Sequence, residues 1–273
     1  MSKPNLTFIG GGNMATSLIG GLVEKGYPAD AITATDPVEA SRSRLAANFG
    51  IRTSDDNASA CEQAEVVILA VKPQVMKQVA SDLSTALTHR PLIISIAAGI
   101  TMDALADWLG GDLPIVRCMP NTPALVETGA AGLFANGQVS SQQKQLASEI
   151  LDAVGISCWL EGEADIDAVT ALSGSGPAYY FLVMEIMEKV GTELGLTPDV
   201  ARQLTLQTAL GAAKMAMASD VDAAELRRRV TSPGGTTQRA IETFQQGDLE
   251  ALFRKAMNGA AERAREMAAE LAN

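Results

Sequence analysis

Several short stretches of this sequence have the residue types and spacing that could bind anions and orient small planar molecules. The first begins at Gly10, where an apolar run gives way to three consecutive glycines and then to a helical pattern. In the spacing Gly10-x-Gly12-x-x-Ala15, the first glycine permits a tight turn and the second lets a diphosphate approach the backbone, while a small third residue lets the helix pack on the strand. The amides at the start of that helix would bind the phosphates. This spacing predicts a dinucleotide site; the alternatives are S-adenosylmethionine binding and a turn without a ligand.

An acidic residue after the next apolar run supports a dinucleotide. Residues 31–35 lead to Asp36, whose carboxylate can accept a hydrogen bond from a ribose hydroxyl. An acid at this place favours NADH, because it repels the 2′-phosphate of NADPH. Arg42 and Arg44 follow closely and could neutralise that phosphate, so we expect both NADPH and NADH to be usable.

Three further stretches lie where apolar runs end, at the edge where open α/β sheets bind ligands. Lys72 could contact a phosphate, a ribose or a substrate, or it could be a solvated lysine at the start of a loop. The small residues of Ser95–Gly99 would let a flat ring lie on the backbone. Asn121 and Thr122 lie between two prolines, so they could orient an amide group or could merely satisfy their own turn.

Two glycine-rich stretches interrupt the second half of the chain. Residues 173–178, Ser-Gly-Ser-Gly-Pro-Ala, place two glycines and a proline inside a helical pattern, which weakens a helix without improving its packing. Residues 231–237, Thr-Ser-Pro-Gly-Gly-Thr-Thr, lead directly into another helical pattern. Their amides and hydroxyls could hold a carboxylate, although an ordinary helix start is the simpler interpretation.

The elements that must position these stretches divide the chain in two. Near-continuous apolar strands alternate with helices up to about residue 162, which predicts a mainly parallel sheet with helices on both faces. We therefore expect an α/β dinucleotide-binding domain over residues 1–162 and an all-helical domain over residues 163–273. The helices of the second domain are expected at residues 164–195, 198–219, 222–230, 234–246 and 249–271. The first of them is apolar around most of its circumference, so we expect a second subunit to cover it in an obligate homodimer; the alternative is a monomer in which the first domain covers that surface.

Composition opposes several other functions. The 273 residues carry a formal net charge of −11, which disfavours binding to nucleic acid and to anionic membranes. There is no apolar run of membrane-spanning length, and the first four residues lead straight into a strand, so we expect a cytoplasmic protein without a secretory signal. Three scattered cysteines and a single histidine, His89, argue against disulfides, a metal site and a histidine base.

Together these stretches resemble the Δ1-pyrroline-5-carboxylate reductase family over essentially the whole chain. Five segments in order carry the resemblance: Phe8–Ala15, Ala70–Pro73, Met119–Pro123, Ser173–Tyr179 and Ser232–Thr237. It implies an N-terminal Rossmann domain followed by an all-α dimerisation domain, and a homodimer that can assemble further into a decamer. The implied reaction is the reduction of pyrroline-5-carboxylate to L-proline, the last step of proline biosynthesis, by hydride transfer from NADPH or NADH.

The resemblance also implies roles for single residues. The residue pattern predicts cofactor contacts from Asp36 and the small residue Ala97, and the resemblance adds the other expected contacts. The full set is Gly10, Gly12, Asn13, Met14, Asp36, Asn57, Ala70, Lys72, Pro73, Ala97 and Asn121. It implies that the substrate carboxylate is held by a loop of the partner subunit, formed by Ser232, Gly234, Gly235, Thr236 and Thr237. Thr237 would hydrogen-bond the ring nitrogen and is the expected catalytic residue.

Two other functions are compatible with a dinucleotide site. A β-hydroxyacid dehydrogenase also joins a Rossmann domain to helices, but that family uses a lysine, with an asparagine one turn away, in the interdomain helix. The segment after Gly176 has neither at that position. A non-catalytic dinucleotide-binding sensor would bind the cofactor without turnover, and it gives no reason for a second anion-binding loop.

Overall fold

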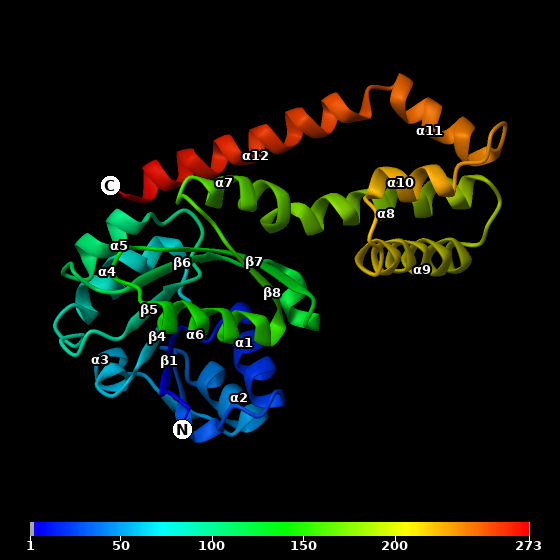
Figure 1. The fold of residues 1–273 in the computed structure, drawn as a ribbon. Coiled ribbons are helices and arrows are strands. Elements are labelled where there is room, and N and C mark those ends of the chain that lie inside the picture. Colours follow the sequence, from blue (N-terminus) through cyan, green and yellow to red (C-terminus); the bar gives the residue numbers. More distant parts are fainter. Residues whose placement is uncertain (1–2, 273) are drawn as a thin grey trace. The chain divides into compact units, whose positions relative to one another are not determined.

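The structure, a computed structural model, describes residues 3–272 and divides the chain into two compact units (Figure 1). The first unit comprises the residues up to Ser175 together with those from Ala260 onward. The second unit spans Gly176–Gly259.

An eight-stranded sheet forms the centre of the first unit. Its strands are β1 (Leu6–Ile9), β2 (Ile32–Thr35), β3 (Arg52–Ser54), β4 (Val66–Leu69), β5 (Leu92–Ser95), β6 (Ile115–Met119), β7 (Gly129–Ala135) and β8 (Gly155–Trp159). They lie in the order β3-β2-β1-β4-β5-β6-β7-β8, and every neighbouring pair is parallel except β6 and β7. The chain reverses its direction of travel across the sheet at β1, and such a switch point is where open α/β sheets bind ligands. The mainly parallel sheet is confirmed.

Helices cover both faces of this sheet and bury two separate apolar cores. The helices α1 (Asn13–Glu24), α2 (Glu39–Phe49) and α6 (Ser141–Leu151) contribute to one core, and α3 (Asn57–Cys61), α4 (Pro73–Leu83) and α5 (Met102–Trp108) contribute to the other. Strand β4 shows how the pleat sorts side chains between them, because Val66 and Ile68 join the first core while Val67 and Leu69 join the second. Three short 3₁₀ turns complete the connections: η1 (Ala29–Ala31), η2 (Thr122–Val126) and η3 (Asp152–Val154).

The long helix expected over residues 164–195 is interrupted. It consists of α7 (Asp165–Val169), a π-helical turn η4 (Thr170–Gly174) and α8 (Gly176–Glu193). The Ser175 amide donates to the Thr170 carbonyl at 2.8 Å, a step of five residues that widens the helix. The π-turn overlaps the glycine-rich stretch of residues 173–178 at Ser173 and Gly174, where the sequence predicts a weakened helix.

The second unit is built only of helices. It contains α8, α9 (Pro198–Met217), α10 (Ala223–Arg229), α11 (Thr236–Gln246) and the first part of α12 (Leu249–Ala272). Thr197 and Asp222 cap α9 and α10 with their side-chain oxygens. Many large apolar side chains of these helices are exposed, including Tyr180, Phe181, Leu204, Leu210 and Phe253. The all-helical character of this part is confirmed.

The last turns of α12 belong to the first unit. A Cβ at Gly99 would lie 3.1 Å from Leu271 Cδ1, and Leu271 packs against the second core of the sheet. Arg265 of α12 also lies 3.8 Å from the Asp167 carboxylate of α7. The two compact units therefore meet after Ser175 and after Gly259. The domain boundary that the sequence predicts at residue 162 stays a prediction.

Two negative findings apply to residues 3–272. Within that range, no helix has both the length and the apolar character needed to cross a membrane. The same residues contain no group of three or more histidine, cysteine, aspartate or glutamate side chains placed to hold a metal ion.

Candidate cofactor and substrate sites

The glycine turn after β1 has the geometry of a diphosphate cradle. Gly10 has a φ of +105°, and a Cβ there would lie 2.7 Å from the Ala70 carbonyl oxygen, so the turn needs glycine at this position. Gly12 precedes α1 as its N-cap residue, and a Cβ built there would meet no described atom within 4 Å. Within residues 3–272, α1 begins without a side-chain cap. Open space beside Gly12 and uncapped first-turn amides are what a bound diphosphate requires.

The carboxyl ends of neighbouring strands meet at this turn. The Gly10 amide donates to the Thr35 carbonyl of β2 at 2.9 Å, and the Ala70 amide donates to the Ile9 carbonyl of β1 at 2.8 Å. Because the strands run parallel, the residues that follow them share one edge of the sheet. That edge brings together seven of the predicted cofactor residues: Gly10, Gly12, Asn13, Met14, Asp36, Ala70 and Ala97.

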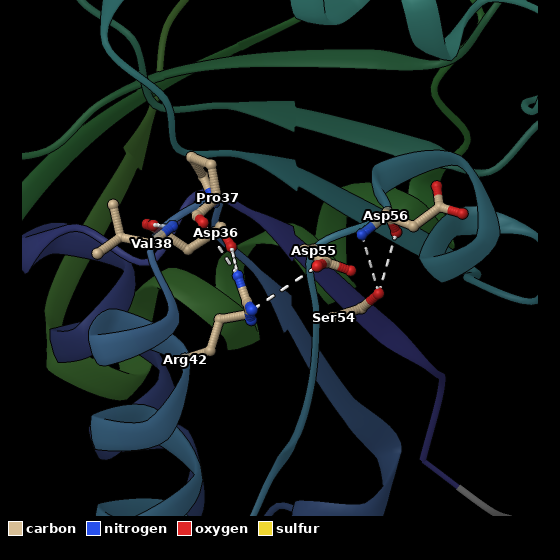
Figure 2. Close-up of polar contacts among 7 residues, drawn as sticks. All are labelled: Asp36, Pro37, Val38, Arg42, Ser54, Asp55 and Asp56. Carbon is tan, nitrogen blue, oxygen red and sulfur yellow. Dashed lines mark hydrogen bonds and ion pairs between the residues drawn. The ribbon is translucent and has the colours of Figure 1, made fainter.

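Asp36 lies at the tip of β2, and its carboxylate already binds two backbone amides. Oδ2 accepts a hydrogen bond from the Gly11 amide at 3.0 Å. Oδ1 accepts one from the Val38 amide at 2.8 Å (Figure 2). Each carboxylate oxygen can accept a further hydrogen bond, so a ribose hydroxyl can still bind. Asp36 therefore supports the glycine turn in addition to its predicted contact with the sugar.

The two arginines of α2 hold the same region. Arg42 Nη1 donates to the carbonyls of Asp36 and Pro37 at 2.7 and 3.1 Å, and Arg42 Nη2 lies 3.7 Å from Asp55 Oδ2 (Figure 2). Arg44 Nη2 reaches the Gly11 carbonyl at 3.5 Å. Both guanidinium groups are thus tied to the backbone of the predicted cofactor site.

Asn57, Lys72 and Pro73 lie where helices begin at this edge. Asn57 is the first residue of α3, and its Oδ1 accepts a 2.6 Å hydrogen bond from the hydroxyl of Thr35 in β2. Lys72 is exposed and precedes α4. Pro73 is the first residue of α4, where the missing backbone N–H costs nothing, because an N–H at that position has no partner within the helix. The structure therefore places these three predicted cofactor residues on segments that follow β3 and β4.

Asn121 follows β6, and both the nitrogen and the oxygen of its side-chain amide are hydrogen-bonded to backbone groups. Nδ2 donates to the Ser173 carbonyl at 3.0 Å, and Oδ1 accepts from the Ala130 amide at 2.8 Å. These bonds connect the loop after β6 to β7 and to the π-turn η4. A Cβ at Gly174 in that turn would lie 2.6 Å from Met119 Cε. Asn121 thus fixes the position of the π-turn, and its contact with a nicotinamide stays a prediction.

Arg117 of β6 is a buried cation whose partner the sequence pattern does not reveal. Its side chain is 5% exposed, and Nη1 donates to Glu163 Oε1 at 2.6 Å. The same carboxylate oxygen accepts from the Met102 amide at the start of α5, at 2.7 Å. Glu163 therefore joins β6, α5 and the segment before α7. The only sign of this ion pair in the local sequence is the charged residue Arg117 inside an apolar strand.

The second glycine-rich loop leads into α11 within the second unit. Gly234 has a φ of +72°, and Gly235, the N-cap residue, donates its amide to the Ser232 carbonyl at 3.0 Å. In the part of the chain that is described, α11 starts without a side-chain cap, and Thr236 and Thr237 are exposed in its first turn. The first-turn amides of an uncapped helix can bind a carboxylate. The structure brings the predicted substrate residues together in one tight turn.

The three cysteines are free, and they differ in exposure. Cys61 and Cys118 are buried, whereas Cys158 is exposed in β8. Burial raises the pKa of the Cys61 thiol to about 12 and also raises the pKa of Cys118. Protonated thiols are poor nucleophiles, so we expect Cys118 to be unreactive in the folded protein despite its place near the end of β6.

We expect a colorimetric disulfide reagent to titrate one thiol per chain in the native protein and three after denaturation. Cys158 is the accessible group, because the other two thiols are buried and protonated. The Cys158→Ser variant should lose the rapid phase. A rapid phase that persists in this variant would show that a buried thiol is reactive.

Comparison with known proteins extends these observations. Residues 163–267 match the family model described as pyrroline-5-carboxylate reductase dimerisation, and residues 5–99 match the model described as NADP oxidoreductase, coenzyme F420-dependent. A pyrroline-5-carboxylate reductase of Pseudomonas aeruginosa is 55% identical over 271 residues, which cover 99% of both chains. A solved pyrroline-5-carboxylate reductase of Coxiella burnetii superposes with a TM-score of 0.94 at 45% identity, covering 97% of this chain and 98% of that one. The NADP-bound enzyme of Plasmodium falciparum superposes with a TM-score of 0.86 at 28% identity, covering 98% of this chain and 99% of that one.

Proposed function

Since this chain belongs to the pyrroline-5-carboxylate reductase family, we propose that it reduces Δ1-pyrroline-5-carboxylate to L-proline with NADPH or NADH as the hydride donor. The observation that carries the proposal is that two glycine-rich turns each lead into a helix without a side-chain cap among the described residues, so each turn is a candidate anion cradle. One is the glycine turn at Gly10–Met14, and the other is the uncapped helix start at Ser232–Thr237. A protein that only senses a dinucleotide has no use for the second cradle.

The chemistry needs few reactive side chains. When bound, the reduced nicotinamide supplies a hydride to the carbon of the C=N bond. A protonated imine nitrogen makes this easier, because it neutralises the electron pair that the nitrogen gains. A cyclic imine can arrive already protonated, so the chain needs no strong acid. The position of the one histidine agrees with a reaction that needs no histidine acid. His89 is exposed in a loop, and its Nε2 lies 2.9 Å from the Ala64 carbonyl oxygen.

Binding and orientation therefore supply most of the rate enhancement. Gly10 and Gly12 let the backbone hold the diphosphate, and the Asp36 carboxylate accepts a hydrogen bond from a ribose hydroxyl. The amides at the start of α11, with the Ser232 hydroxyl, hold the substrate carboxylate. Thr237 is too weak an acid to supply the proton alone, but its hydroxyl can orient the ring nitrogen and relay a proton from water. In this proposal the loop at 232–237 that completes each site comes from a second subunit.

A single assay tests the proposal against its alternatives. The purified protein is mixed with NADH or NADPH and pyrroline-5-carboxylate, and oxidation of the reduced nicotinamide is followed by its absorbance. We expect oxidation that depends on the imine. Tight cofactor binding without oxidation would instead indicate a sensor. Activity with a β-hydroxy acid and NAD⁺, but none with the imine, would indicate a β-hydroxyacid dehydrogenase.

We expect the protein to have at least twice the 28.5 kDa mass of one chain at low micromolar concentration. The exposed apolar side chains of α8 support this expectation, because contiguous apolar surface of this kind marks an interface. Light scattering measures the mass. Phe181→Glu, at a side chain that is 64% exposed in α8, should lower it, whereas Ile156→Glu, at a side chain that is 60% exposed in β8, should not. A monomeric wild type would contradict the dimer.

The finer assembly and location belong to the same proposal. We propose that dimers associate further into a decamer, and that the protein works in the cytoplasm without nucleic acid or a membrane as a partner. The net charge of −11 supports the exclusion of polyanionic partners. Light scattering of the wild type tests the decamer, which requires a mass ten times that of one chain.

A further inference from the structure

Three aspartates follow strands β2 and β3, beside the sugar end of the predicted cofactor site (Figure 2). Asp36 follows β2, and Asp55 and Asp56 follow β3; the Asp36 amide donates to the Ser54 carbonyl at 3.2 Å, which joins the two strand ends. Asp36 is bound to the amides of the glycine turn and the β2–α2 turn. Asp56 Oδ1 accepts hydrogen bonds from the amides of Ala58 and Ser59 at the start of α3, at 3.0 and 3.2 Å. Two of the three carboxylates are therefore committed to the backbone.

Asp55 is different, because the side chain it faces is the Arg42 guanidinium. Arg42 is 19% exposed, and its Nη1 is fixed by the carbonyls of Asp36 and Pro37. Its Nη2 lies 3.7 Å from the Asp55 carboxylate, which is 73% exposed. That separation is too long for a hydrogen bond, and exposed ion pairs contribute little to stability. Arg42 is thus a cation that the backbone holds in place, and Asp55 is a weak and replaceable partner for it.

We propose that Asp55 determines cofactor specificity by opposing the 2′-phosphate of NADPH at the Arg42 guanidinium, which biases the enzyme toward NADH. The inference rests on the proposed cofactor site. A ribose held by Asp36 carries its 2′ group at the β2–α2 turn, where Arg42 is the fixed cation. A 2′-phosphate there must compete with Asp55 for Arg42 and must also approach the Asp36 carboxylate. A 2′-hydroxyl meets neither cost, because it is uncharged and can donate a hydrogen bond to the Asp36 carboxylate.

Asp55→Asn should raise kcat/KM for NADPH by about fivefold and leave kcat/KM for NADH within about twofold, the range expected from an exposed ion pair. Asp112→Asn is the matched control. Asp112 is 72% exposed and lies 2.8 Å from Arg90, in the connection between α5 and β6. The same loss of charge at that position should leave the ratio of the two cofactors unchanged.

Binding of nucleotide fragments tests the inference without turnover. By calorimetry, Asp55→Asn should bind adenosine 2′,5′-bisphosphate about fivefold more tightly and adenosine 5′-monophosphate as before. The gain should disappear in the double variant Arg42→Gln/Asp55→Asn. An unchanged dissociation constant for the bisphosphate in Asp55→Asn, or a full gain in the double variant, would overturn the role of Asp55. A wild type that binds neither the monophosphate nor NADH would instead overturn the proposed cofactor site.

Discussion

Replacing Gly12 with alanine will weaken the binding of both NADH and NADPH by about 10- to 100-fold while leaving the melting temperature unchanged. The position has a φ of −71°, which alanine adopts freely, and a Cβ there meets no described atom within 4 Å. The added methyl group therefore costs the folded protein nothing. It occupies space that a diphosphate needs, and losing one charge-assisted hydrogen bond costs about 1.5–3 kcal/mol. Calorimetric titration with each cofactor, together with a thermal melt, measures both quantities.

Gly10→Ala supplies the contrast, because there the protein itself excludes the methyl group. Gly10 has a φ of +105° and lies against the Ala70 backbone, so this variant should lose both stability and cofactor affinity. Gly26→Ala is the control for backbone strain alone, since Gly26 has a φ of +84° and no described atom within 4 Å of an added Cβ. It should lower the melting temperature slightly and leave cofactor binding intact. Wild-type affinity in Gly12→Ala would place the diphosphate elsewhere.

Thr237→Ala will lower kcat by about 10- to 100-fold and leave the dissociation constants of NADH and NADPH nearly unchanged. Thr237 lies in the first turn of α11, in the second unit, whereas the residues predicted to bind the cofactor lie in the first unit. Its hydroxyl is proposed to orient the imine nitrogen, and a hydrogen bond to a charged group contributes about 1.5–3 kcal/mol. Stopped-flow oxidation of the cofactor and a separate cofactor titration measure the two effects.

Two variants define the specificity of this result. Thr243→Ala makes the same change further along α11, where the Thr243 hydroxyl donates to the Arg239 carbonyl at 2.9 Å, and it should keep full activity. Thr237→Ser retains the hydroxyl and should restore most of the turnover. Loss of cofactor affinity with unchanged kcat in Thr237→Ala would place this loop at the nucleotide instead of the substrate.

Residue types alone predict the parts of the candidate site that depend on local backbone requirements. The turn requires glycine at Gly10, where φ is above zero. A bound diphosphate would require it at Gly12, where the space beside the backbone is open. Both requirements can be recognised within ten residues of sequence. The uncapped start of α11 is equally local. The pattern did not predict β3 or α3, because both are short and β3 carries an exposed arginine, Arg52, without apolar periodicity. It predicts a weakened helix at residues 173–178, but not the π-turn at Thr170–Gly174 that overlaps the start of this stretch.

Local sequence patterns predict where the backbone can turn and which faces are apolar, and hence an α/β sheet domain followed by helices. The contacts between distant polar side chains are visible only in the folded chain. Asp36 binds the Gly11 amide, Asn121 binds the Ser173 carbonyl, and Arg117 binds Glu163, across separations of 25 to 52 residues. Turns and amphipathic faces arise from neighbouring residues, whereas these contacts arise from the order in which the strands pair.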